Sequence, residues 1–86
     1  MTQLIHIADI ENWIGHEFVS DWVVVDQPLI NDFARVTDDH AWVHVDIPRA
    51  TALRGGTIAH GLLILTLFPG LMGSLYEIVG TAHGLN

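Results

Sequence analysis

The sequence contains no cysteine and no lysine, and it has only three arginines among its 86 residues. The absence of cysteine excludes disulfide bonds and thiolate metal sites, and it fits a reducing compartment. Ten acidic residues against the three arginines give a formal net charge of −7. Nucleic-acid binding needs lysine or arginine to neutralise phosphates, so nucleic acid is all but excluded as a partner, and anionic membrane surfaces are disfavoured.

Targeting and membrane signals are also scarce. The N-terminal stretch MTQLIHIADIENWIG has neither a basic region nor a long apolar region, so we expect no signal peptide and a cytoplasmic protein. Residues 58–76 (IAHGLLILTLFPGLMGSLY) carry no Asp, Glu, Lys or Arg and approach the length of a membrane span. Pro69 and several glycines interrupt this run, and no basic residue flanks its C-terminal side. We therefore predict a helix buried on all sides in a soluble fold.

The remaining hydrophobic pattern predicts short elements within a single domain that comprises residues 1–86. A short helix is expected over Asp9–Ile14, capped by Asp9 and ended by Gly15. Phe18–Val25 (FVSDWVVV) is rich in β-branched and aromatic residues, which is typical of a strand. Residues 77–86 are expected to be either the start of a further strand or a frayed tail.

Two more helices have recognisable start signals. Asp26 is a good N-cap residue, and Pro28 favours the first turn that follows it. The predicted buried face of this helix consists of three apolar residues spaced i, i+4 and i+7, namely Leu29, Phe33 and Val36. A second helical turn should begin at Pro48 and end before Gly55.

Residues 37–46 (TDDHAWVHVD) concentrate ionisable side chains, which are costly to bury unless they have partners. Asp39 and His44 form a candidate acid–base pair. A carboxylate and an imidazole placed together in an apolar pocket can divide the acceptance and the delivery of a proton. The structural alternative is that Asp39 caps the following turn and that His44 is a half-buried histidine with its hydrogen bonds satisfied.

Other chemistries find little support. His40 and His44 have the i, i+4 spacing that suits zinc on a helix, but the segment is poor helix material and suggests no further ligand, so we expect no metal. Neither serine of the chain lies in a GxSxG motif, and the GxGxxG and P-loop patterns are absent, so we expect no serine nucleophile and no nucleotide cofactor. Three isolated histidines are expected at the solvated surface, namely His6, His16 and His83.

Together, TDDHAWVHVD and the later run GGTIAHGLLILTLF resemble the MaoC-like dehydratase and (R)-specific enoyl-CoA hydratase family, and within it the NodN-like branch. The family pattern has an Asp and a His separated by four residues, then a Gly-Ile-Ala-His-Gly-like run that opens a central helix. In this sequence the matching positions are Asp39, His44 and residues 56–61. The family's Asn and Pro are replaced by Ala41 and Trp42.

The resemblance implies a hot-dog fold of the α+β class, in which a curved antiparallel sheet wraps a long central helix, usually in a homodimer or higher homo-oligomer. It also implies (R)-specific hydration of 2-enoyl-CoA thioesters, or the reverse dehydration of 3-hydroxyacyl-CoA, with no cofactor. Asp39 and His44 would hold the water and move the proton to or from the α-carbon, and the Gly61 N–H would polarise the thioester carbonyl. Because the resemblance covers only the N-terminal part of the family domain, the domain is expected to be truncated after its central helix.

Two other functions remain open. Many hot-dog thioesterases carry a catalytic acid on the central helix, and residues 58–76 contain none. A catalytically silent module that acts in assembly or binding is favoured by the missing strands, whereas Asp39 and His44 favour the enzyme.

Overall fold

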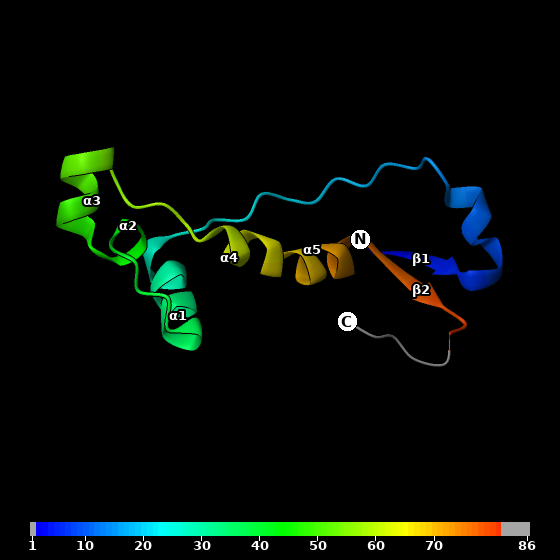
Figure 1. The fold of residues 1–86 in the computed structure, drawn as a ribbon. Coiled ribbons are helices and arrows are strands. Elements are labelled where there is room, and N and C mark those ends of the chain that lie inside the picture. Colours follow the sequence, from blue (N-terminus) through cyan, green and yellow to red (C-terminus); the bar gives the residue numbers. More distant parts are fainter. Residues whose placement is uncertain (1, 82–86) are drawn as a thin grey trace. The chain divides into compact units, whose positions relative to one another are not determined.

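A computed structural model describes residues 2–81 and divides the chain into two compact units (Figure 1). Residues 22–67 form one unit, and the residues on either side of them form the other. The unit of residues 22–67 contains four helices: α1 (Gln27–Thr37), α2 (Trp42–Val45), α3 (Ile47–Arg54) and α4 (Gly61–Thr66). The other unit contains β1 (Gln3–His6), a 3-10 helix η1 (Ile7–Trp13), α5 (Phe68–Leu75) and β2 (Tyr76–Val79).

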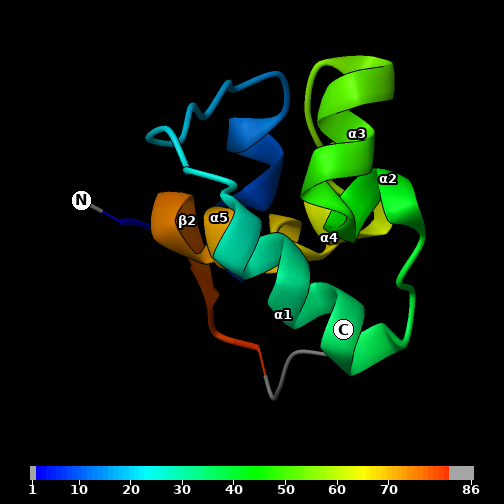
Figure 2. The ribbon, with the colours of Figure 1, turned by 90° about the vertical axis from the view of Figure 1, so that its left-hand side faces the viewer.

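Helix α1 begins where the sequence predicts. Asp26 accepts a hydrogen bond from the N–H of Leu29 through Oδ1 at 3.1 Å, and Pro28 lies in the first turn. The buried face is shifted from the predicted one, because Ile30 and Ala34 are buried while Val36 is 74 % exposed. Helix α2 packs against both α1 and α3, and Figure 2 shows these three helices together.

Helix α3 also follows local signals. Asp46 caps it by accepting a hydrogen bond from the N–H of Arg49 through Oδ1 at 3.1 Å. It ends at Gly55, whose φ of +82° is the left-handed conformation that glycine adopts without steric cost. The predicted turn beginning at Pro48 and ending before Gly55 is therefore confirmed, with one more residue at its start.

The prediction of a strand over Phe18–Val25 is wrong for this structure, in which residues 16–26 form neither helix nor strand. A strand needs a hydrogen-bonding neighbour, and within residues 2–81 the only paired strands are β1 and β2. These two strands pair in parallel, with Ile5 opposite Ile78, whereas the resemblance implied a curved antiparallel sheet. Of the two possibilities for residues 77–86, the strand is found as β2, which begins one residue earlier, and residues 82–86 lie outside the described part of the chain.

The single long helix predicted over residues 58–76 is instead two helices, α4 and α5, with Leu67 between them. Pro69 explains the interruption, because it has no N–H to donate to the carbonyl of Leu65 and its ring crowds that carbonyl. The N–H of Leu67 bonds to Ile64 O at 3.3 Å, which is the i to i−3 pattern of a 3-10 turn. None of the helices in the described residues is both long and apolar enough to cross a membrane.

The short N-terminal helix exists, but its predicted cap is wrong. Helix η1 begins at Ile7 rather than near Asp9, and His6 caps it by accepting a hydrogen bond from the N–H of Ala8 on Nδ1 at 3.1 Å. Gly15 follows the helix with a φ of +83°, as its predicted role at the end requires.

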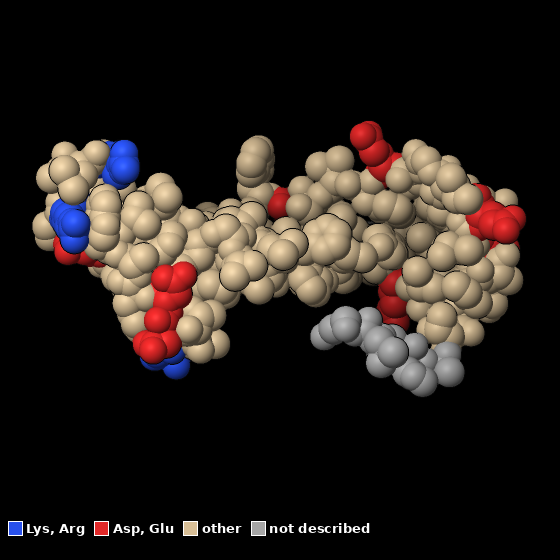
Figure 3. All heavy atoms as spheres, viewed as in Figure 1, with Lys and Arg blue, Asp and Glu red and all other residues tan. Residues whose placement is uncertain are grey.

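Apolar side chains of α4 are exposed in the single chain, so the expected burial of this helix on all sides needs further protein around it. Leu63 is buried, but Leu62 and Leu65 are 67 % and 65 % exposed. On the face drawn in Figure 3, wide stretches carry no Asp, Glu, Lys or Arg side chain. Leaving a few hundred Å² of apolar surface in water forfeits several kcal/mol at about 25 cal/mol per Å².

We therefore expect the 86-residue chain to self-associate through its exposed apolar surface, as sedimentation velocity at micromolar concentration can show. The double variant Leu62→Glu/Leu65→Glu should lower the sedimentation coefficient toward that of a monomer, because both positions are exposed and accept charge without disturbing a core. A compact wild-type monomer that unfolds cooperatively would contradict this expectation.

Candidate functional site

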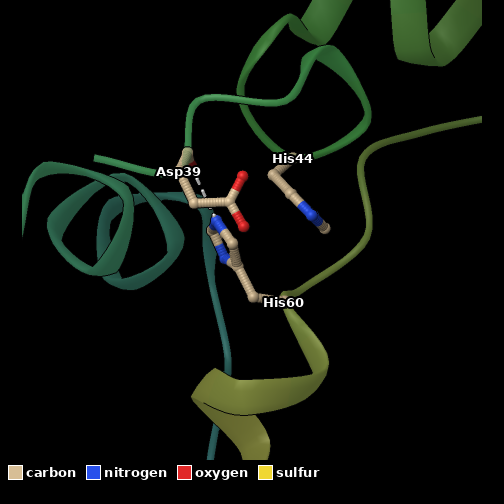
Figure 4. Close-up of side chains that lie close together, drawn as sticks. All are labelled: Asp39, His44 and His60. Carbon is tan, nitrogen blue, oxygen red and sulfur yellow. Dashed lines mark hydrogen bonds between the residues drawn. The ribbon is translucent and has the colours of Figure 1, made fainter. Parts of the chain in front are cut away.

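Asp39, His44 and His60 lie together within the unit of residues 22–67, and Figure 4 shows their side chains pointing toward one another. One oxygen or nitrogen atom from each side chain lies within 4.8 Å of the corresponding atoms of the other two. They come from three segments: the loop after α1, helix α2, and the residue directly before α4. The structure thus brings together the predicted pair and adds a histidine to which the sequence assigned no role.

The end of α1 positions Asp39. The helix terminates at Asp38, whose φ of +59° is left-handed and turns the chain sharply. The N–H of Asp39 reaches Thr37 Oγ1 at 3.4 Å, and Asp39 Oδ1 accepts a hydrogen bond from the N–H of Ala41 at 3.3 Å. Asp39 therefore does cap the following turn, as the structural alternative held. This cap uses one carboxylate oxygen, and Oδ2 has no hydrogen-bond partner within residues 2–81.

His44 is held by a two-way contact between α2 and Ile58. The N–H of Ile58 donates to Val43 O at 3.0 Å, and Nδ1 of His44 lies 2.7 Å from Ile58 O. Because a carbonyl oxygen only accepts, the neutral His44 ring carries its proton on Nδ1. Its Nε2 then has a free lone pair and can accept a proton.

Gln27, the first residue of α1, ties the same segments together and was missed by the sequence analysis. Its Nε2 donates to the carbonyl of His44 at 2.8 Å, and its Oε1 accepts a hydrogen bond from Thr57 Oγ1 at 2.5 Å. One side chain therefore fixes the start of α1, the backbone of α2 and the residue before Ile58. No local sequence signal distinguishes this glutamine from an ordinary residue in a first helical turn.

His60 is the buried member of the cluster, with 3 % of its surface exposed. Its Nε2 lies 3.0 Å from Asp39 O, so Nε2 carries the proton of the neutral ring. The ring stacks on His44 with centroids 3.9 Å apart and planes 24° apart, and it contacts Phe33 at 4.9 Å and 59°. The sequence offered one signal for this residue: a lone histidine inside an apolar run directly before Gly61.

The other ionisable residues near the cluster have local structural roles. His40 Nε2 lies 3.2 Å from Asp38 Oδ1 at the surface, and the Arg49 guanidinium lies over the Trp42 ring at 4.4 Å. His6 and His16 are exposed, as predicted. His83 lies outside the described residues.

The ring geometry does not favour a metal site, although two histidines and a carboxylate can hold zinc. Imidazole lone pairs lie in the ring plane, so the stacked rings of His44 and His60 direct their nitrogens side by side rather than toward one point. We expect elemental analysis of the purified protein to find only traces of metal. Added zinc should leave the thermal unfolding midpoint of the protein unchanged. Stoichiometric metal in the purified protein would contradict this expectation. So would a rise of the midpoint with zinc that the variant His44→Asn does not show.

A separate pocket of about 300 Å³ lies in the other unit, near η1 and the two strands. Apolar and aromatic side chains dominate its lining, and His16 is its only residue with acid–base chemistry near neutral pH. The site of chemistry is therefore better sought at Asp39 and His44 than in this pocket.

Comparisons with known proteins identify the family of this chain. The model of the family described as MaoC like domain matches residues 9–81. The 3-hydroxyacyl-thioester dehydratase Z of Mycobacterium tuberculosis is 46 % identical over 82 residues, which cover 93 % of this chain and 54 % of that protein. Nodulation protein N of Rhizobium meliloti is 38 % identical over an alignment of 90 residues, gaps included. The alignment covers 95 % of this chain and 56 % of that protein.

The chain thus spans about half the length of the curated relatives that it matches. The matched region of the family model includes the whole cluster, from Asp39 through His60. The chain belongs to the MaoC-like domain family.

Proposed function

We propose that this chain belongs to an (R)-specific hydratase that adds water to 2-enoyl-CoA thioesters, or runs the reverse dehydration of 3-hydroxyacyl-CoA. The observation that supports this most directly is the cluster of Asp39, His44 and His60, which places a carboxylate beside an imidazole with a free nitrogen. The relative of 46 % identity is named a 3-hydroxyacyl-thioester dehydratase, and dehydration of a 3-hydroxyacyl thioester is the reverse direction of the proposed hydration.

The proposed chemistry needs two proton transfers. Asp39 and His44 hold a water molecule, and one of them accepts a proton from it while the water oxygen bonds to C3 of the enoyl group. The electron pair of the C2=C3 bond moves toward the thioester carbonyl as an enolate. The proton taken from the water then passes through the pair to C2, which gives the 3-hydroxyacyl thioester and returns both residues to their starting protonation states.

Gly61 supplies the proposed stabilisation of the enolate oxygen. It is the first residue of α4, and the first N–H groups of a helix have no acceptor within the helix. It directly follows His60, a member of the cluster, so its N–H belongs to the same part of the unit. A donor aimed at the developing oxyanion stabilises the transition state more than the substrate.

We further propose a hot-dog fold for the whole domain, cytoplasmic placement, and assembly as a homodimer or higher homo-oligomer. The exposed apolar side chains of α4 and of residues 19–24 support burial against further protein. No metal and no cofactor are required by this chemistry.

Two alternatives make different predictions. A thioesterase would release free coenzyme A, and it is disfavoured because neither α4 (GLLILT) nor α5 (FPGLMGSL) carries an acid. A silent module for assembly or binding would turn over no thioester.

The test is incubation of the purified chain with crotonyl-CoA. Loss of the conjugated enoyl absorbance together with formation of 3-hydroxybutyryl-CoA is the expected result. Release of free thiol instead would indicate the thioesterase, and an unchanged substrate would indicate the silent module. Either of these two outcomes contradicts the proposed activity for this chain.

A further inference from the structure

His60 has a place in the site that the proposed reaction does not use. It lies directly before α4 as the N-cap residue, with extended backbone angles (φ −61°, ψ 136°), but its side chain makes no capping hydrogen bond to the helix. Serine, threonine, aspartate and asparagine are the residues that stabilise a helix from this position. The sequence thus forgoes a local stabilising cap, and the side chain is directed to Asp39 instead.

The first contact of His60 is with the main chain that carries the carboxylate. Its Nε2–H donates to Asp39 O at 3.0 Å, across 21 residues of sequence. Within residues 2–81, the other hydrogen bonds of Asp39 are those to Thr37 and Ala41 at 3.4 Å and 3.3 Å, which are long for hydrogen bonds. The contact to His60 therefore joins this loop to the segment that starts α4.

The second contact is with the ring of His44. The two imidazoles stack at 3.9 Å with 24° between their planes, and the ring of Phe33 contacts His60 at 4.9 Å. The hydrogen bond to Ile58 O fixes one edge of the His44 ring. The stacked ring of His60 limits rotation of the His44 ring about this hydrogen bond. Held on one face and at one edge, His44 can present Nε2 in one direction.

The Nδ1 atom of His60 argues against a role in packing alone. Nδ1 is buried and has no hydrogen-bond partner in the described part of the chain. A buried polar atom without a partner is unfavourable, so an apolar ring would be the more stable occupant if packing alone mattered. A phenylalanine would lack the donor to Asp39, and a glutamine would lack the ring that faces His44.

We propose that His60 is a positioning residue for the hydration reaction, which holds the Asp39 backbone and the His44 ring in their reactive arrangement. This inference rests on the proposed function. His60 itself accepts no proton and touches no substrate in this role. Its replacement should therefore lower kcat through misplacement of the pair, with little change in KM.

Two variants separate the two contacts. His60→Phe keeps a flat ring against His44 and removes the donor to Asp39, whereas His60→Gln keeps a donor and removes the ring. Each should lower kcat for crotonyl-CoA hydration by about 10- to 100-fold while KM changes less than about threefold, because misplacing catalytic groups slows the chemical step more than binding. His40→Gln is the matched control, since His40 is an exposed histidine of the same region, and it should leave kcat unchanged.

Nuclear magnetic resonance gives a readout that does not depend on turnover. In His60→Phe the amide signals of residues 39–41 should shift because the bond to Asp39 O is lost. In His60→Gln the ring protons of His44 should lose the ring-current shift that a stacked imidazole causes. His16→Gln, which replaces an exposed histidine of the other unit, should change neither set.

The outcomes are distinguishable from failure of the proposed function. If the wild-type chain does not hydrate crotonyl-CoA, the function fails and the resonance shifts alone decide the role of His60. Wild-type kcat in both variants, or unshifted Asp39 and His44 signals in whichever variant folds by circular dichroism, would overturn the inference.

Discussion

Replacing Asp39 or His44 by alanine is expected to lower the rate of crotonyl-CoA hydration by at least about 100-fold, the usual scale for loss of a general acid or base. The two side chains lie in one cluster, and each supplies a group that the proposed proton transfers need. The measurement is kcat for each purified variant against wild type. His40→Ala is the control, because His40 is an exposed neighbour in the same stretch and should leave the rate unchanged.

More conservative variants separate chemistry from local structure. Asp39→Asn retains an oxygen that can accept the hydrogen bond from the N–H of Ala41, but it loses the carboxylate. His44→Asn retains a donor in the position of Nδ1, facing Ile58 O, but it loses Nε2. Both should be as inactive as the alanine variants and should fold like the wild type. Near-normal activity in either variant would show that the pair is not the catalyst.

The second large effect is expected at Gly61, where proline removes the N–H and little else. Gly61 is the first residue of α4, a position in which proline is favoured, and His60 before it has the extended ψ of 136° that a following proline requires. If this N–H stabilises the enolate oxygen, Gly61→Pro should lower kcat by about 100- to 1,000-fold. The measurement is again crotonyl-CoA hydration, together with the thermal unfolding midpoint.

Gly61→Ala is the matched control for the proline variant. A Cβ at this position meets no atom within 4 Å, so alanine fits the space and keeps the N–H. Its kcat should stay close to that of the wild type. Equal activity of the proline and alanine variants, with both folded, would remove the Gly61 N–H from the mechanism.

Local signals in the sequence predicted the elements that position the site. Asp26, Pro48 and Gly55 act through their own side chain or backbone angle, so helices α1 and α3 could be read from a few consecutive residues. The pairing of Asp39 with His44 was likewise inferred from a short motif. Its geometry follows from the left-handed turn at Asp38, which redirects the chain after α1.

The failed strand and the missed histidine depend on contacts distant in sequence, whereas the failed helix prediction has a local cause. Phe18–Val25 has the composition of a strand but no neighbouring strand to bond to within residues 2–81. The helix of residues 58–76 was predicted from hydrophobicity, and the effect of Pro69 on the preceding turn was underestimated. The role of His60 was invisible because its partner, Asp39 O, is a main-chain atom that lies 21 residues away.

Hydration of crotonyl-CoA in D₂O, with chiral analysis of the product, tests the central claim most directly. If Asp39 and His44 act as one acid–base pair on one face of the substrate, the wild type should form only the (R)-3-hydroxy product. That product should carry a single deuterium at C2 in one configuration, and Asp39→Asn should form almost none of it. A mixture of both enantiomers, deuterium in both configurations at C2, or undiminished product from Asp39→Asn would contradict the account.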